Sequence, residues 1–125
     1  RQSVLAGCAL DIDAVIDCYG AWVLTPTDAD STIQVSSLED RLPRLSCPVL
    51  GMFGAEDKHP SPEEVDRFDK VLSELGVEHE FHTFEDAGHG FFGVDRPGYR
   101  QAAATEGWRF VRDFLERHLD VKGDR

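Results

Sequence analysis

Residues 47–57 read CPVLGMFGAED, and this stretch decides the fold class. Pro48 favours an extended conformation for the residue before it, and the apolar run at 49–53 ends at Gly54. A short apolar run bounded in this way is typical of a strand buried on both faces, as the inner strands of a parallel sheet are. The sequence therefore predicts a buried strand from Val49 to Gly54.

Two further strands are predicted, one on each side of this run in the chain. The first covers Ile12–Tyr19, where β-branched and apolar residues precede Gly20. The second begins near Glu80 and is centred on Phe81–Phe84. Residues 21–43 predict a long irregular loop with a single helical turn at 37–42.

Two amphipathic helices complete the pattern. Ser61, Pro62 and Glu64 combine an N-cap hydroxyl, a proline at the first helical position and a capping-box carboxylate, and Gly76 ends this helix. A second helix is predicted over 99–119, and the polar tail after it is expected to fray. The order predicts one α/β domain over residues 1–125, with a mostly parallel sheet in the middle of three layers.

Composition and charge exclude several classes of partner. The 125 residues are 41% hydrophobic and 30% charged, which is typical of one globular domain. The formal net charge of -11 repels nucleic acid and anionic membranes, so neither is an expected partner. No apolar run is long enough to span a bilayer and Arg1 opens no recognisable signal peptide, so we expect a cytoplasmic protein. The three cysteines lack metal-ligand spacing and are expected to be reduced and mostly buried; they are Cys8, Cys18 and Cys47.

Asp57 and His89 are the residues that the pattern selects for chemistry. Each follows a predicted strand by four or five residues, at the edge of the sheet where the carboxyl ends of the strands collect catalytic groups. If the two strands are neighbours, about 4.8 Å apart, the side chains can meet. A carboxylate bonded to an imidazole fixes its tautomer and stabilises the imidazolium that forms when the histidine takes a proton. Gly88 and Gly90 allow the tight turn that aims the ring inward.

Other readings of these residues are weaker. A lone loop histidine is ordinarily solvated or capping, but its pairing with Asp57 favours the catalytic interpretation. Glu56 could compete for the acid role, although it would point to the other side of an extended turn. His59 is expected on a surface turn near the site. The remaining histidines are expected to be solvated or to flank strands, and no pair has metal spacing, so no metal or cofactor is expected; they are His79, His82 and His118.

Several segments resemble the dienelactone hydrolase family of α/β hydrolases. They are the strand and turn at 47–57, the turn DAGHGF at 86–91, the opening of the last helix from Tyr99 to Trp108, and the segment DAVIDCYG at 13–20. The resemblance covers nearly the whole chain. It implies a partial α/β-hydrolase fold and hydrolysis of carboxyl ester or lactone bonds in small molecules. By the resemblance Asp57 is the triad acid and His89 the base, in the chain order nucleophile, acid, histidine.

The nucleophile that the family pattern requires is not recognisable. The fold places it in a Gly-x-Ser-x-Gly or Gly-x-Cys-x-Gly elbow between a strand and a helix, and no such motif occurs. By the resemblance, residues 1–10 look like the helix that follows the elbow, so the chain would begin just after it. Cys8 follows Gly7 but has neither the second glycine nor a preceding strand. Neither Cys8 nor Ser3 is expected to be catalytic.

The resemblance departs from the family pattern at the substrate site as well. Dienelactone hydrolase itself is understood to hold a substrate carboxylate with arginines, one of them shortly after the histidine. Here the apolar segment 91–94 follows the histidine and Arg96 comes later. We therefore expect an apolar pocket wall, and an ester or lactone other than dienelactone.

Two functional hypotheses remain, and they differ in where the nucleophile is. In the first, a longer polypeptide or a second chain completes a serine or cysteine hydrolase. In the second, the chain is a non-catalytic hydrolase remnant that acts as an oligomerising interaction module. The strand at 12–19 would then be an open apolar edge that pairs with another chain, so a homodimer or a complementing hydrolase half is expected. A flavodoxin-like or receiver-type domain lacks support, because no acidic cluster follows an early strand and no glycine-rich phosphate loop occurs.

Overall fold

The centre of the protein is a three-stranded parallel sheet, as a computed structural model that describes residues 1–119 shows. Its strands are β1 (Val15–Cys18), β2 (Val49–Gly54) and β3 (His79–Phe84), in the order β1-β2-β3. Val15 pairs with Val49, and Val49 pairs with His79. Every residue of β2 is buried, which confirms the strand predicted from the apolar run.

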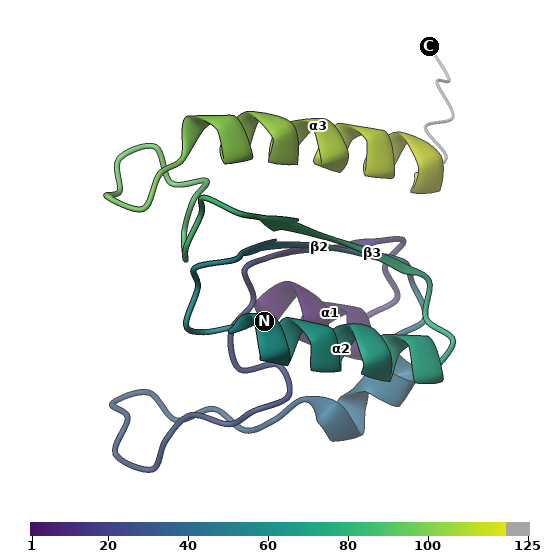
Figure 1. Ribbon diagram of the computed structural model, residues 1–125. Helices are drawn as coiled ribbons and strands as arrows, with labels where there is room; N and C mark the ends of the chain where they lie inside the picture. The colour runs from purple at the N-terminus through teal and green to yellow at the C-terminus, as the bar shows by residue number, and fades with distance from the viewer. Residues whose placement is uncertain (120–125) are drawn as a thin grey trace.

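Helices cover both faces of this sheet, so the fold has the three layers expected (Figure 1). On one face lie α1 (Gln2–Ala9), α2 (Pro62–Glu74) and the 3-10 helix η1 (Glu39–Arg44), and on the other lies α3 (Gln101–His118). Alternate side chains of β2 serve the two layers: Val49 and Phe53 pack in the core under α2, and Leu50 and Met52 pack under α3. This is the α/β-hydrolase type of arrangement that the resemblance implied.

The start of α2 follows the capping signals in the sequence. The Ser61 Oγ accepts a hydrogen bond from the Glu64 amide at 3.3 Å, and Pro62 occupies the first helical turn. At the other end Gly76 has a φ of +70°, a backbone conformation that glycine adopts without strain. Both predicted limits of this helix are confirmed. The start of α2 at Pro62 also sets where the loop after β2 ends.

Strand β1 is shorter than the predicted strand at 12–19. The Val15 amide donates to the Pro48 carbonyl at 2.9 Å. Pro48 has no amide hydrogen and cannot donate to β1, so the pairing of the two strands begins here. At the other end Tyr19 has a φ of +43°, which turns the chain out of the extended conformation. The difference at both ends therefore comes from backbone geometry.

The long segment between β1 and η1 is irregular, as predicted, but it is anchored. The Leu38 amide donates to the Val23 carbonyl at 2.7 Å, and both side chains are buried in the core with Leu24. The Thr27 amide donates to the Val35 carbonyl at 3.2 Å and closes the outer part of the loop. The predicted turn at 37–42 is found as η1, displaced by two residues.

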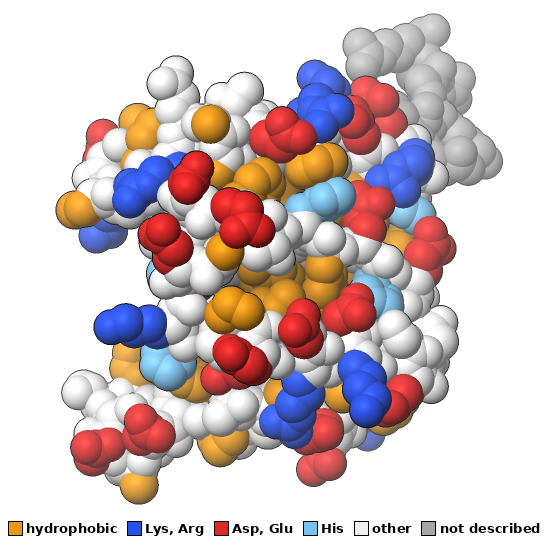
Figure 2. All heavy atoms as spheres, in the orientation of Figure 1, with side chains coloured by type: hydrophobic (Ala, Val, Ile, Leu, Met, Phe, Trp, Pro, Cys, Tyr) orange, Lys and Arg blue, Asp and Glu red, His pale blue; other side chains and the backbone are white. Residues whose placement is uncertain are grey.

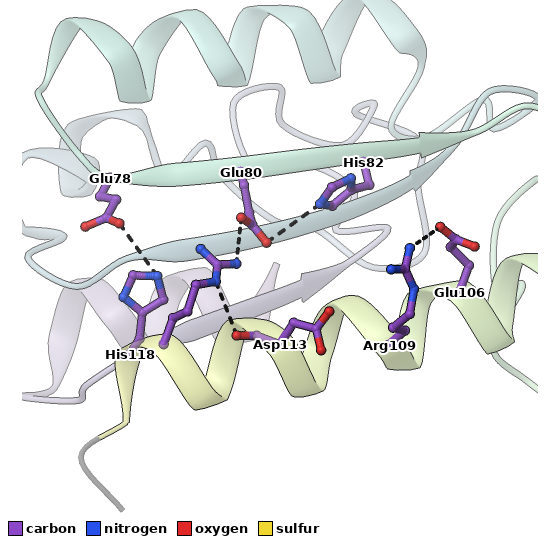
Figure 3. A network of polar contacts seen from close by, with 8 residues as sticks. Glu78, Glu80, His82, Glu106, Arg109, Asp113 and His118 are labelled. Carbon is purple, nitrogen blue, oxygen red and sulfur yellow. Dashed lines mark hydrogen bonds and ion pairs between the residues drawn. The ribbon is translucent and has the colours of Figure 1, made fainter.

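A network of charged side chains joins β3 to α3 along the outer edge of β3 (Figure 3). Glu80 is 2.8 Å from Arg117, and Glu78 is 3.6 Å from His118. Of the histidines expected to be solvated or to flank strands, His79 begins β3, but its side chain and that of His118 are covered, at 10% and 15% exposed. Sequence reasoning missed this because the partner of His79, Asp69, is on another element, α2.

The surface agrees with the negative charge of the sequence. Acidic side chains are spread over the face seen in Figure 2, with apolar patches between α3 and α2. No helix in the part of the chain that the structure describes is both long and apolar enough to cross a membrane. The tail after Leu119, which was predicted to fray, lies outside the described residues.

Candidate active site

Asp57 lies three residues beyond β2, buried at the carboxyl end of the sheet. Both of its carboxylate oxygens have partners. Oδ2 lies 2.9 Å from Nδ1 of His89, and Oδ1 accepts a hydrogen bond from the His59 amide at 2.9 Å. A carboxylate held at both oxygens has one orientation, and here that orientation faces the imidazole.

His89 lies in the segment between β3 and α3, and its side chain is 55% exposed. Its ring packs edge-on against Tyr19, with the ring centroids 5.0 Å apart. The carboxylate of Asp57 accepts a hydrogen bond from Nδ1, so the proton of the neutral ring is on Nδ1. The lone pair is then on Nε2, on the side away from Asp57. The pair can therefore take a proton at Nε2 and stabilise the cation that results.

Backbone contacts hold the two loops together. The Ala55 amide donates to the Phe84 carbonyl at 2.9 Å, and the Glu56 amide donates to the Ala87 carbonyl at 3.0 Å. Of the two glycines beside His89, Gly90 has a φ of +77°, whereas Gly88 has no positive φ. Both glycines were expected to be needed for the turn, but only Gly90 has a backbone conformation that favours glycine.

A hollow lies beside the Asp57 and His89 pair. It is lined by Trp22, Glu56, Asp57, Lys58, His59 and His89. In the space-filling view the outline is indented on the left, at the end of the sheet where the strands finish (Figure 2). The indole of Trp22 stacks on the ring of His59, with the centroids 5.5 Å apart and the planes at 22°.

Trp22 is the residue of this site that sequence reasoning missed. It lies in the irregular segment after β1, with a φ of +52°. The Arg1 side chain donates to the Trp22 carbonyl at 3.2 Å and to the Ser36 carbonyl at 2.8 Å, which holds this part of the loop over the site. No local pattern could have placed Trp22, because its position depends on contacts with a distant part of the chain.

The aromatic residues expected to line the pocket lie elsewhere. Phe91 is fully buried against Tyr19 and Phe84, and Phe92 packs against Trp108 of α3. Neither lines the hollow, so the expected wall is corrected to Trp22 and His59. The physical reason is that the segment after His89 turns back into the core under α3.

The alternative acid, Glu56, is exposed and lines the hollow, and its backbone amide rather than its carboxylate contacts the His89 loop. The carboxylate that contacts the imidazole is that of Asp57. Among residues 1–119, no group of three His, Cys, Asp or Glu side chains is arranged to hold a metal ion.

The thiols do not reach the site. Cys8 is buried on α1 among apolar side chains, and burial raises the pKa of its thiol. Cys18 is half-buried, and burial, with the nearby Asp17, raises the pKa of its thiol to about 11. In the part of the chain that the structure describes, no hydroxyl or thiol side chain lines the hollow. Among the described residues, the hollow therefore has a carboxylate and an imidazole in contact, with no hydroxyl or thiol beside them.

Comparisons with known proteins agree on the family. The model of the "Dienelactone hydrolase family" matches residues 3–119. A protein of Salmonella typhimurium, provisionally named carboxymethylenebutenolidase, is 33% identical over 79 residues, which are 63% of this chain and 29% of that protein. A similarly named protein of Methylorubrum extorquens is 28% identical over 98 residues, covering 78% of this chain and 34% of that protein.

Solved structures show the same fold. A provisionally named dienelactone hydrolase from Klebsiella pneumoniae matches 94% of this chain and 48% of its own length, with a TM-score of 0.80 and 23% identity. An acylaminoacyl peptidase from Pyrococcus horikoshii matches 99% of this chain and 23% of its own length, with a TM-score of 0.74 and 18% identity. The chain thus spans between 23% and 48% of the length of the proteins that it matches here.

Proposed function

Since the chain belongs to the dienelactone hydrolase family, we propose that it supplies the acid and the base of a triad that hydrolyses carboxyl ester or lactone bonds. Asp57 is the acid and His89 the base in this proposal. The observation that carries it is the 2.9 Å contact between Asp57 Oδ2 and His89 Nδ1, beside an open hollow at the carboxyl end of the sheet.

The proposed reaction is acyl transfer in two steps. A serine or cysteine attacks the acyl carbon while His89 takes its proton at Nε2, and the leaving alcohol then receives that proton. Water then gives a proton to His89 at Nε2 and attacks the acyl-enzyme, and His89 returns that proton to the serine or cysteine as the acid leaves. Asp57 keeps the proton on Nδ1 throughout and stabilises the imidazolium in each step.

The nucleophile in this proposal comes from outside the 125 residues. No hydroxyl or thiol lines the hollow among the described residues, and the chain corresponds to only part of its relatives. The missing group would be carried by a longer polypeptide or by a second chain, in a strand-to-helix elbow of the family type. Backbone amides of that elbow would form part of the oxyanion hole.

The test is hydrolysis of 4-nitrophenyl acetate by a polypeptide that contains both the elbow and these residues. We expect His89→Ala and Asp57→Asn to lower kcat by about a thousandfold or more. Glu85→Gln is the matched control, because Glu85 is exposed on the segment before His89 and does not line the hollow, and it should keep the activity. Equal rates in all variants would refute the assignment.

A second proposal concerns the free edge of β1, which pairs with β2 alone among the described residues. We propose that a strand from outside the chain pairs with this edge, either from the rest of a longer polypeptide or from a second copy in a homodimer. Light scattering over a range of concentrations distinguishes these occupants. A monomer at every concentration would exclude the homodimer.

We also propose a cytoplasmic location, which the three free cysteines favour because that compartment keeps thiols reduced. Alkylation of a freshly made cell extract tests this. Complete labelling of the three thiols after unfolding is expected, and any cysteine protected as a disulfide would contradict it.

A further inference from the structure

We propose that Trp22 is a specificity-determining residue, and that its indole binds a flat, uncharged aromatic or conjugated group of the ester. The inference rests on the proposed function, since it names the substrate class of the same site. It starts from the position of the hollow: Trp22 and His59 line it together with His89, so a carbonyl that reaches His89 brings its neighbouring groups against these two rings.

The two rings form one continuous aromatic surface. Their planes are 22° apart and their centroids 5.5 Å apart, so the rings are in contact and leave no room for a ligand between them. A ligand therefore meets their outer surfaces. Flat π systems stack on such surfaces with more contact than a saturated ring of the same size can make.

The backbone that carries the two rings is held in place before a ligand arrives. The His59 amide is bonded to Asp57 Oδ1 at 2.9 Å, and the Trp22 carbonyl accepts from Arg1 at 3.2 Å. The neighbouring Ala21 and Val23 are buried, which anchors the backbone on both sides of the indole. A surface held in this way loses little freedom when it binds a ligand.

The charges around the hollow argue against an anionic group. Lys58 and Glu56 both line it, so the one lysine is offset by a carboxylate, and no arginine is among the lining residues that the structure describes. The net charge of -11 also opposes the approach of an anion. A neutral flat group fits these surroundings better than a carboxylate does.

The test compares two neutral ketones that cannot be hydrolysed, acetophenone and cyclohexyl methyl ketone, by NMR titration of the backbone amide of Lys58, which lines the hollow and is present in every variant. The same ketones are titrated into Trp22→Phe, Trp22→Asn and His59→Ala. Asparagine tolerates the positive φ at this position, so Trp22→Asn removes the ring without adding backbone strain. His59→Ala keeps the amide that binds Asp57 and serves as a second variant if Trp22→Asn does not fold.

We expect acetophenone to bind about fivefold more tightly than the saturated ketone. Trp22→Phe should keep this preference, and Trp22→Asn and His59→Ala should lose or reduce it. Equal affinity for the two ketones, no saturable shift with either, or a preference that survives in Trp22→Asn would overturn the inference; if that variant does not fold, a preference that survives in His59→Ala would overturn it. Because this binding needs no nucleophile, a ketone preference without His89-dependent hydrolysis in the longer polypeptide would refute only the catalytic proposal.

Discussion

Gly54, the last residue of β2, lies directly against the main chain of Ala87, and a Cβ on this glycine would be 2.3 Å from the Ala87 carbonyl oxygen. This contact joins the segment that carries Asp57 to the segment that carries His89. The two loops can approach closely enough for the 2.9 Å contact between Asp57 and His89 because the residue between them has no side chain.

The first prediction is that Gly54→Ala destabilises the protein by about 1–3 kcal/mol, because the backbone of the His89 segment must move to admit the methyl group. Gly88→Ala is the matched control: its Cβ would have no neighbour closer than 4.0 Å, and its φ is not positive. Urea unfolding measures both. A Gly54→Ala variant as stable as Gly88→Ala would contradict the close approach of the loops.

The second prediction concerns the cap of α2, which begins just after the Asp57 loop. Ser61→Ala should lower the free energy of unfolding by about 1 kcal/mol, since the Glu64 amide loses its acceptor. Ser73→Ala, an exposed change near the other end of this helix, should have little effect. Thermal unfolding compares the two variants, and an equal loss of stability in both would contradict the capping role of Ser61.

The third prediction is a pH dependence that comes from Asp17. This carboxylate is 1% exposed, its Oδ2 has no hydrogen-bond partner among the described residues, and burial raises its pKa in the folded protein above the ordinary value of 3.8. The folded state therefore holds this proton more tightly than the unfolded state. The contribution of Asp17 to stability is largest below pH 3.8 and declines as the pH rises from there through the folded pKa.

Asp17→Asn removes this titration, so its stability relative to the wild type should increase as the pH rises from about 4 to 7. Urea unfolding at several pH values measures the difference. Taking the difference cancels the other carboxylates, which titrate in both proteins. A constant difference across this range would show that Asp17 has the same pKa in the folded and unfolded states.

The fourth prediction is that the thiols react slowly. Cys8 and Cys47 are buried, and burial raises the pKa of both, so each holds less thiolate than a free cysteine at the same pH. Labelling by iodoacetamide at pH 8, followed by mass spectrometry, should be slower than for free cysteine and should speed up in urea. Rapid labelling of Cys8 in the folded chain would reopen its role as a nucleophile.

Much of the fold follows from local signals. The apolar run at 49–53 predicts a buried strand, and the capping residues around Ser61 predict the helix that follows. The ends of β1 were not predictable in this way. They depend on the missing amide hydrogen of Pro48, whose carbonyl accepts from the Val15 amide, and on the positive φ of Tyr19.

The candidate site likewise contains residues that the sequence predicted and one that it did not. Asp57 and His89 could be selected because each follows a strand at the same edge of the sheet, and the structure brings the two side chains together. Trp22 could not, because the loop that carries it has no repeating pattern and is held by contacts with Arg1 and Leu38. The pocket wall expected after His89 was wrong because Phe91 turns into the core.

The tautomer of His89 in this chain, read from the ¹⁵N shifts of its imidazole ring above pH 8, decides whether Asp57 orients this ring as proposed. We expect a proton on Nδ1 in the wild type and in Glu56→Gln, and loss of that preference in Asp57→Asn, because Asp57 Oδ2 is the acceptor. A proton on Nε2 in the wild type, unchanged in Asp57→Asn, would contradict this expectation, since His89 could not then accept a proton from a nucleophile at Nε2.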